Sequence, residues 1–117
     1  MKVKSYEDLI AWQKAIELVA KVYRATNDFP RREIFVLTSQ MRRCAISVPS
    51  NIAEGQGRLS TGEFKQFLGH ARGSIFELQT QIKIATMLGY FEKRAAEELK
   101  DAAAEVGRIL QGLIASL

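Results

Sequence analysis

Apolar residues recur at intervals of three and four along four segments of the 117-residue chain, which is the spacing of one face of an α-helix. The segments span about residues 6–26, 31–54, 60–88 and 92–115. No stretch shows the sustained alternation of a β-strand. In the first segment the stripe consists of Leu9, Trp12, Ile16, Val19, Ala20 and Tyr23. The pattern therefore predicts an all-α chain of four helices.

The second and fourth stripes are equally regular. Their members are Ile34, Leu37, Met41, Cys44, Ala45, Val48 and Ile52 in the second segment, and Ala95, Leu99, Ala102, Val106, Ile109 and Leu113 in the fourth. Pro49 lies inside the second stripe, where it removes one helical hydrogen bond. Because the stripe keeps its phase on both sides, we predict that the second helix is kinked at Pro49 rather than broken.

Turn-forming residues separate the segments. Residues 27–30 (Asn-Asp-Phe-Pro) follow the first segment, residues 55–57 (Gly-Gln-Gly) close the second, and Gly89 ends the third. Residues 60–63 (Ser-Thr-Gly-Glu) have the pattern of a capping box at a helix start. Connections this short favour antiparallel neighbours, so we predict one domain over residues 1–117, an up-down-up-down four-helix bundle.

The third helix has two apolar faces. One face, directed to the core, consists of Phe64, Phe67, Leu68, Ala71, Ile75, Leu78, Ile82 and Ala85. The opposite face carries Gly69, Gly73, Phe76, Thr80, Ile84 and Met87 in heptad-like steps. A helix in a small monomeric bundle needs only one apolar stripe. We interpret the second face as a contact with another subunit, the alternative being a surface that tolerates scattered apolar residues.

Composition narrows the class of protein. Apolar residues make up 47% of the chain and charged residues 26%, which are ordinary globular values. No apolar run is long enough to span a membrane, and residues 1–9 lack the apolar core of a secretory signal. Because a single cysteine excludes an intrachain disulfide, we expect a cytoplasmic protein.

Positive charge concentrates in the middle of the chain. The net charge is +4, and residues 29–88 carry eight basic against four acidic side chains. Such side chains bind nucleic-acid phosphates without reading sequence, or form a solvated surface. The candidates for nucleic-acid binding are Arg31, Arg32, Arg42, Arg43, Arg58, Lys65 and Arg72. We favour Arg58 and Lys65 among them because they lie at or near the predicted turn between two helices.

A dense polar stretch surrounds Pro49. We interpret it as a network that fixes the register of the second helix, with binding of a ligand as the alternative. Glu77 on the third helix is a candidate partner for Arg42 or Arg43. The predicted members of the network are Arg43, Ser47, Ser50, Asn51, Glu54 and Glu77.

Catalytic and metal-binding patterns are not found in the sequence. His70 is the only histidine, and the Glu-x-x-His pair of di-iron bundles is missing, so we expect no metal and no cofactor. Cys44 lies on a core stripe without the partners of a catalytic thiol. No Walker loop, dinucleotide fingerprint, zinc finger or recognition helix is present. We therefore predict a protein that is not an enzyme.

Four stretches carry a family resemblance: residues 6–15 (YEDLIAWQKA), 37–43 (LTSQMRR), 47–58 (SVPSNIAEGQGR) and 67–74 (FLGHARGS). Together they resemble the bacterial four-helix-bundle proteins encoded in intervening sequences of 23S rRNA genes. The resemblance is dense over residues 5–90 and loose in the last helix. Cys44 occupies a position where the family commonly has alanine.

The resemblance implies a cytoplasmic bacterial protein, a homopentameric barrel and no established catalytic activity. A related branch, the accessory variability proteins of diversity-generating retroelements, is a basic pentamer that binds nucleic acid and a reverse transcriptase. By analogy, our leading hypothesis is a non-enzymatic oligomer that binds structured RNA or DNA. The alternatives are a docking module for a protein such as a polymerase, and a di-metal bundle enzyme.

Overall fold

The computed structural model describes residues 5–117; residues 1–4, which belong to the predicted domain and to the stretch judged not to be a secretory signal, lie outside the described residues. Its four long helices are α1 (Ile10–Thr26), α2 (Ser39–Gln56), α3 (Thr61–Met87) and α4 (Lys93–Ser116). No strand occurs between residues 5 and 117, so the prediction of an all-α chain with four helices is confirmed.

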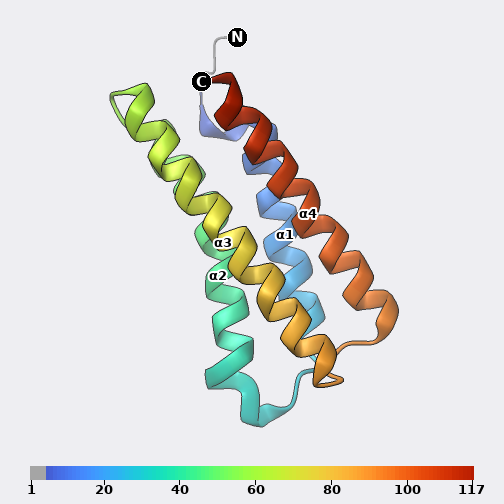
Figure 1. The fold of residues 1–117 in the computed structure, drawn as a ribbon. Coiled ribbons are helices and arrows are strands. Elements are labelled where there is room, and N and C mark those ends of the chain that lie inside the picture. Colours follow the sequence, from blue (N-terminus) through green and yellow to red (C-terminus); the bar gives the residue numbers. More distant parts are fainter. Residues whose placement is uncertain (1–4) are drawn as a thin grey trace.

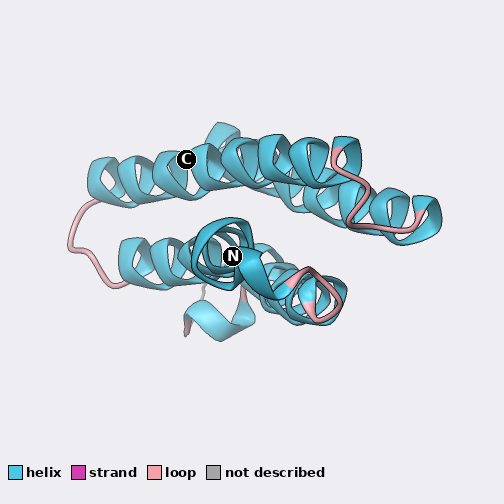
Figure 2. Cartoon of the chain, turned by 90° about the horizontal axis from the view of Figure 1, so that it is seen from below, coloured by secondary structure: helices cyan, strands magenta, loops and turns pink. Residues whose placement is uncertain are grey.

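Successive helices run in alternating directions (Figure 1). α1 packs against α2 and α4, and α3 packs against the same two helices. Viewed from below, the helices lie in two layers joined by short loops (Figure 2). The molecule measures 44 × 24 × 19 Å, and its long axis matches the roughly 40 Å length of a 27-residue helix such as α3.

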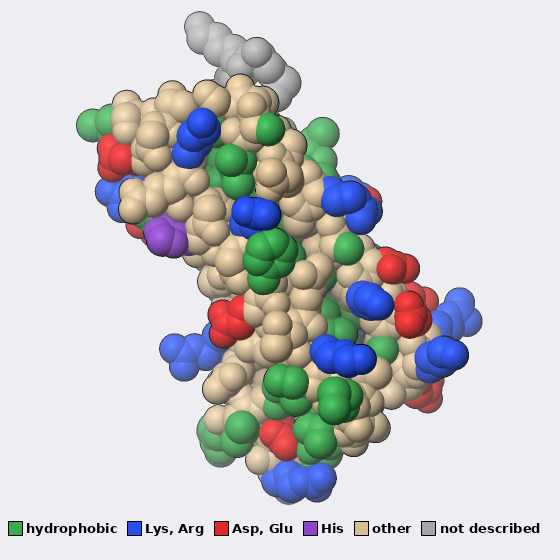
Figure 3. Space-filling view, in the orientation of Figure 1, with side chains coloured by type: hydrophobic (Ala, Val, Ile, Leu, Met, Phe, Trp, Pro, Cys, Tyr) green, Lys and Arg blue, Asp and Glu red, His purple; other side chains and the backbone are tan. Residues whose placement is uncertain are grey.

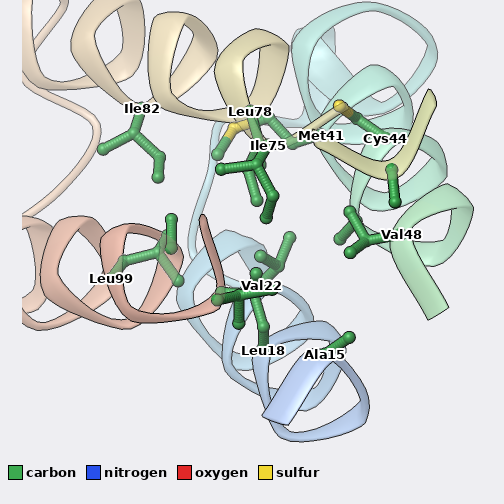
Figure 4. Packing of buried hydrophobic residues seen from close by; sticks show 14 of the residues in the cluster. Ala15, Leu18, Val22, Met41, Cys44, Val48, Ile75, Leu78, Ile82 and Leu99 are labelled. Atoms are coloured by element: carbon green, nitrogen blue, oxygen red, sulfur yellow. The ribbon is translucent and has the colours of Figure 1, made fainter. Parts of the chain in front are cut away.

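One apolar core lies between the four helices. Leu18 and Val22 of α1, Met41 and Val48 of α2, Ile75 and Leu78 of α3, and Leu99 of α4 point toward a common centre (Figure 4). The core face predicted for α3 is buried from Leu68 to Ala85, while Phe64 and Phe67 are half-buried at its edge. One face of α3 is therefore buried in the core, and the opposite face is exposed.

Both ends of α3 form as the sequence predicts. The Ser60 hydroxyl accepts a hydrogen bond from the Glu63 backbone N–H at 3.1 Å, which satisfies one donor of the first turn. Gly89 has φ +76°, in the left-handed region that glycine reaches without a steric cost. This turn lets the Tyr90 N–H donate to the Ala85 carbonyl at 3.0 Å and ends the helix.

Of the stripe predicted for the first helix, Leu9 is buried just before α1 begins, but within α1 another stripe is the buried one. α1 buries Ala11, Ala15, Leu18 and Val22, whereas Ile16 and Tyr23 are exposed and Trp12 and Val19 are half-buried. The two stripes have the same spacing and differ by one residue, or about 100° around the helix. Because the small alanines let α1 approach the core closely, the stripe with the bulkier side chains is turned toward α2 and the surface.

The phase of α4 differs from the prediction in a similar way. Leu99 and Val106 are buried as expected, but Ala103 and Leu110 complete the buried face instead of Ala102 and Ile109, which are half-buried. α4 is rich in alanine, so its apolar surface is broad and its phase is weakly defined by sequence.

The predicted helix beginning near residue 31 starts irregularly. A 3₁₀ turn (Arg31–Glu33) and a π-helical turn (Ile34–Thr38) precede α2. Glu33 fixes this geometry, because its carboxylate accepts from the Leu37 N–H at 3.3 Å and from the Tyr90 hydroxyl at 2.8 Å. As a result Phe35 is 93% exposed. α2 then continues through Pro49, and the kink there stays a prediction.

Candidate nucleic-acid interface and self-association face

The outward side of α3 carries all the residues predicted to contact another subunit. They are Gly69, Gly73, Phe76, Thr80, Ile84 and Met87, and each is exposed in the single chain. Phe76 is 51% exposed and Met87 74%. Green apolar side chains extend from the middle to the lower end of this side of the molecule (Figure 3). We call these six residues the outer α3 face; its contact with another subunit stays a prediction.

Two glycines keep part of the outer α3 face flat. A methyl group added at Gly69 or Gly73 would meet no heavy atom of the described chain, residues 5–117, within 4 Å. Glycine inside a helix costs about 1 kcal/mol relative to alanine, and no close packing among residues 5–117 requires glycine at these two positions. The openness of both positions is compatible with the close approach of another backbone.

Arg42, a candidate for nucleic-acid binding, is held within the protomer. Its guanidinium donates to Thr26 Oγ1 at 2.9 Å, to Asn27 Oδ1 at 3.3 Å and to the Tyr23 carbonyl at 3.4 Å, and it lies 4.6 Å from the centre of the Tyr23 ring. These contacts fasten α2 to the C-terminal end of α1, where a positive charge also suits the helix dipole. The interaction of Arg42 with α1 replaces the pairing with Glu77 considered from the sequence.

Arg58 and Arg72 are stacked on aromatic rings. Arg58 lies 4.6 Å from the centre of the Phe67 ring and pairs with Glu54 at 3.0 Å. Arg72 lies 5.0 Å from the centre of the Phe76 ring, beside the outer α3 face. The carboxylate of Glu54 partly neutralises Arg58, whereas no acidic partner is found for Arg72 among residues 5–117.

The other four basic candidates are exposed. Arg31 and Arg32 lie in the turn before α2, Arg43 lies on α2, and Lys65 lies near the start of α3. Within the described part of the chain, none of them forms an ion pair. Arg32 has one weak contact, with its guanidinium carbon 6.0 Å from the centre of the Tyr90 ring.

A polar cluster joins the middle of α2 to α3. The Ser47 hydroxyl lies 2.6 Å from the Cys44 carbonyl, to which it donates, and 2.7 Å from the Ser74 hydroxyl. The Cys44 thiol donates to the Ser74 carbonyl at 3.0 Å, and the Asn51 amide donates to the Ser47 carbonyl at 2.7 Å. The structure thus brings Ser47 and Asn51 of the predicted network together with Cys44 and Ser74.

The remaining members of the predicted network lie elsewhere or at its edge. Glu77 faces the Cys44 thiol, and Glu54 pairs with Arg58. Ser50 and Arg43 are exposed, and neither side chain makes a hydrogen bond among the described residues. Sequence reasoning missed Ser74. It follows His70 by four residues and precedes Glu77 by three, so its spacing already placed it on the same edge of the helix as Glu77.

The Cys44 thiol is held in its neutral form. Burial, helped by the nearby carboxylate of Glu77, raises the pKa of Cys44 from 9.0 to about 12. A thiol with so high a pKa has very little thiolate at neutral pH, and the thiolate is the nucleophile. Cys44 therefore acts as a packing residue with one hydrogen bond to α3.

We predict that Cys44 in the native protein reacts with an aromatic disulfide reagent at pH 8 roughly 1,000-fold more slowly than in urea, because its pKa is about 12 in the folded chain and 9.0 in the unfolded chain. As the pH rises, the thiol of the unfolded chain loses its proton first. The contribution of Cys44 to the free energy of unfolding is therefore present below about pH 9 and is lost as the pH rises toward 12. Cys44→Ala should remove that part of the pH dependence. Rapid labelling of the native protein would contradict the buried thiol.

Two grooves flank α1. The groove between α1 and α4 has a volume of about 810 Å³. Lys21 and Arg24 line its α1 side, and Glu98 and Asp101 are among the residues on its α4 side. The groove between α1 and α2 has a volume of about 300 Å³. It is lined by Tyr6, Trp12, Ile16, Val19, Ile46, Pro49, Ser50 and Ala53. Sequence reasoning missed both, because each depends on the phase of α1.

Two buried polar residues were also missed. Thr38 is 4% exposed and Gln81 5%, and the Thr38 hydroxyl and Gln81 carbonyl oxygens have no hydrogen-bond partner within residues 5–117. Gln81 follows Leu78 by three residues and precedes Ala85 by four. That spacing puts it on the core side of α3.

The histidine and the acidic residues are spread over the surface and do not gather in one place. No three histidine, cysteine, aspartate or glutamate side chains lie close enough to hold a metal ion in the part of the chain that the structure describes. His70 packs edge-on against Phe67, with ring centres 5.7 Å apart. Among the helices of residues 5–117, none is long and apolar enough to cross a membrane.

These features define a small all-α protein with an exposed apolar face on α3 and exposed basic side chains. The chain belongs to the 23S rRNA-intervening sequence protein family, whose model matches residues 7–112. This confirms the resemblance seen in its motifs. No curated protein sequence matches the chain.

A solved structure has the same fold. It is the crystal structure of a protein of unknown function from the S23 ribosomal protein family of Bacteroides thetaiotaomicron. The TM-score is 0.81 with 19% sequence identity, and the match covers 90% of this chain and 98% of the other. At this identity the similarity is one of fold.

Proposed function

We propose that the protein is a non-enzymatic, self-associating bundle that binds the backbone of structured RNA or DNA in the cytoplasm. The family resemblance supports a pentamer as the assembled form. The observation that carries the nucleic-acid proposal is that five of the seven basic candidates make neither an ion pair nor a side-chain hydrogen bond among residues 5–117, whereas Arg58 pairs with Glu54 and Arg42 is hydrogen-bonded to α1 and the turn after it. The five are Arg31, Arg32, Arg43, Lys65 and Arg72.

Unpaired surface charge of this kind suits phosphate binding. Each lysine or arginine that neutralises a phosphate releases condensed counterions, so affinity falls steeply with salt and depends little on sequence. The five side chains come from α2, from the turn before it and from α3, which pack against each other. Self-association would repeat this set in every copy and so increase the number of phosphates contacted.

Filter binding of a structured RNA across a salt series tests this proposal. With four to five phosphates contacted, affinity should fall at least roughly 100-fold between about 50 and 200 mM salt. Arg43→Gln and Lys65→Gln should each reduce the salt slope by about 1, whatever the RNA sequence. The matched control is Lys100→Gln on α4, which should leave the slope unchanged. No binding at 50 mM salt, or a flat slope, rejects the proposal.

A second function, docking of a protein partner, is favoured by the groove between α1 and α4. Its α1 side carries the basic Lys21 and Arg24, and its α4 side carries three acidic residues beside one basic residue, namely Glu98, Asp101, Glu105 and Arg108. Among residues 5–117, the one ion pair between the two helices joins Lys14 and Glu105 at 3.8 Å. A polymerase or another nucleic-acid-processing protein would be held here without RNA. Pull-down from nuclease-treated lysate separates the functions, because a partner that survives nuclease and is lost in Lys21→Glu/Arg24→Glu supports docking.

A further inference from the structure

The protomer has a second apolar surface, separate from the outer α3 face. It is the groove between α1 and α2, whose walls include Trp12, Ile16, Ile46 and Pro49, and none of the charged residues between 5 and 117 lines it. Ile16 is 42% exposed and Ile46 41%. This is the bulky stripe of α1 that the sequence suggested for the core, and the fold leaves it open.

The groove and the outer α3 face differ in shape. The groove is a hollow of about 300 Å³ that is walled by aliphatic and aromatic side chains. The outer α3 face is the outside of a helix, a ridge that carries Phe76, 51% exposed, and Met87, 74% exposed. The Arg72 guanidinium lies 5.0 Å from the centre of the Phe76 ring, and the position of Gly73, three residues before Phe76, is open. A large aromatic side chain entering an apolar pocket is the usual anchor of a protein interface.

The two surfaces also belong to different helices. A two-fold contact pairs one patch with itself, so a two-fold contact of α3 with α3 would leave the groove between α1 and α2 uncovered. A head-to-tail contact, with the ridge of one copy in the groove of the next, covers both surfaces in every copy once a ring closes. Because every copy of the chain carries one outer α3 face and one groove, copies of this chain can cover both surfaces without any other protein.

We infer that the groove between α1 and α2 receives the outer α3 face of a second copy, with Phe76 as its anchor. This inference rests on the proposed self-association and adds the identity of the opposing surface. The subunit contact is then between unlike surfaces, Phe76 of one copy facing Trp12 and Ile46 of the next.

Chemical cross-linking distinguishes the two kinds of contact. In a Cys44→Ala background, Phe76→Cys/Ile46→Cys treated with a short bismaleimide should give a ladder of covalent oligomers. Neither single-cysteine variant should cross-link, because like positions are far apart in a head-to-tail contact. The control pair, Glu97→Cys/Lys100→Cys on α4, should give no ladder. A covalent dimer from Phe76→Cys alone would overturn the inference in favour of a two-fold contact.

Trp12 gives a measurement without cross-linking. It is the only tryptophan of the chain and lies in the groove, so its emission should shift to shorter wavelength as concentration drives association. Phe76→Ala should abolish the shift. If sedimentation shows an oligomer while the ladder and the Trp12 shift are both missing, the opposing surface is wrong and self-association stands. If sedimentation shows only monomer, both proposals fail.

Discussion

Gly55→Val is expected to destabilise the fold by about 3 kcal/mol, lowering Tm by roughly 10–20 °C. Gly55 is buried at a close approach of α2 to α3. A Cβ atom at Gly55 would lie 2.6 Å from Phe67 Cβ and 3.3 Å from the Phe64 carbonyl oxygen. Both atoms belong to or adjoin the backbone of α3, so the two helices must separate. Thermal unfolding followed by circular dichroism measures the change.

Gly112→Val is the matched control for this prediction. Gly112 is exposed on α4, and a Cβ atom there meets nothing within 4 Å. Since valine is a slightly better helix former than glycine, its stability should stay within about 0.5 kcal/mol of the native chain. Equal effects of the two substitutions would mean that helix propensity, and not the contact between α2 and α3, governs Gly55.

Local signals in the sequence were sufficient for the helices and for the ends of α3. Ser60 and Gly89 act through their own backbone neighbourhood, and their roles depend on no distant residue. The third helix has two apolar faces, and the core face is the one with more large apolar side chains, since the opposite face contains Gly69, Gly73 and Thr80. Where two stripes differ this much in apolar content, spacing and side-chain size together identify the buried side.

Tertiary contacts decide the features that sequence reasoning missed. α1 has two stripes of equal period, and the choice between them depends on how closely Ala11 and Ala15 pack against the core. The turn before α2 depends on a hydrogen bond from Tyr90 to Glu33, which are 57 residues apart. Neither relation has a local signature, so the phase of α1 and the irregular start of α2 were not predictable.

The basic residues of the candidate site were likewise predictable only in part. Composition identified the basic side chains, but it did not show which of them make contacts inside the protomer and which are exposed without a partner among residues 5–117. Arg42 and Arg43 are adjacent in sequence and about 100° apart around α2, so one binds the end of α1 and the other is exposed to solvent. Only the packing of α2 against α1 separates their roles.

Phe76→Asp is expected to convert the self-associated protein into a monomer of 13.1 kDa with little change in protomer stability. Phe76 is 51% exposed in the single chain, so a carboxylate there stays hydrated, and the free energy of unfolding should change by no more than about 0.5 kcal/mol. In an apolar contact between copies the same carboxylate would be buried without a partner, at a cost that exceeds what such a contact supplies. Sedimentation velocity at micromolar concentration measures the mass.

The control, Ile10→Asp, separates a specific contact from a general loss of apolar surface. Ile10 is 61% exposed at the start of α1, outside both the outer α3 face and the groove between α1 and α2, and an acidic residue suits that first turn. Ile10→Asp should therefore keep the native mass. An oligomer that survives Phe76→Asp would show that the outer α3 face is not the contact. If the native chain sediments as a monomer, Gly69 and Gly73 do not have the packing role between copies that is proposed for them.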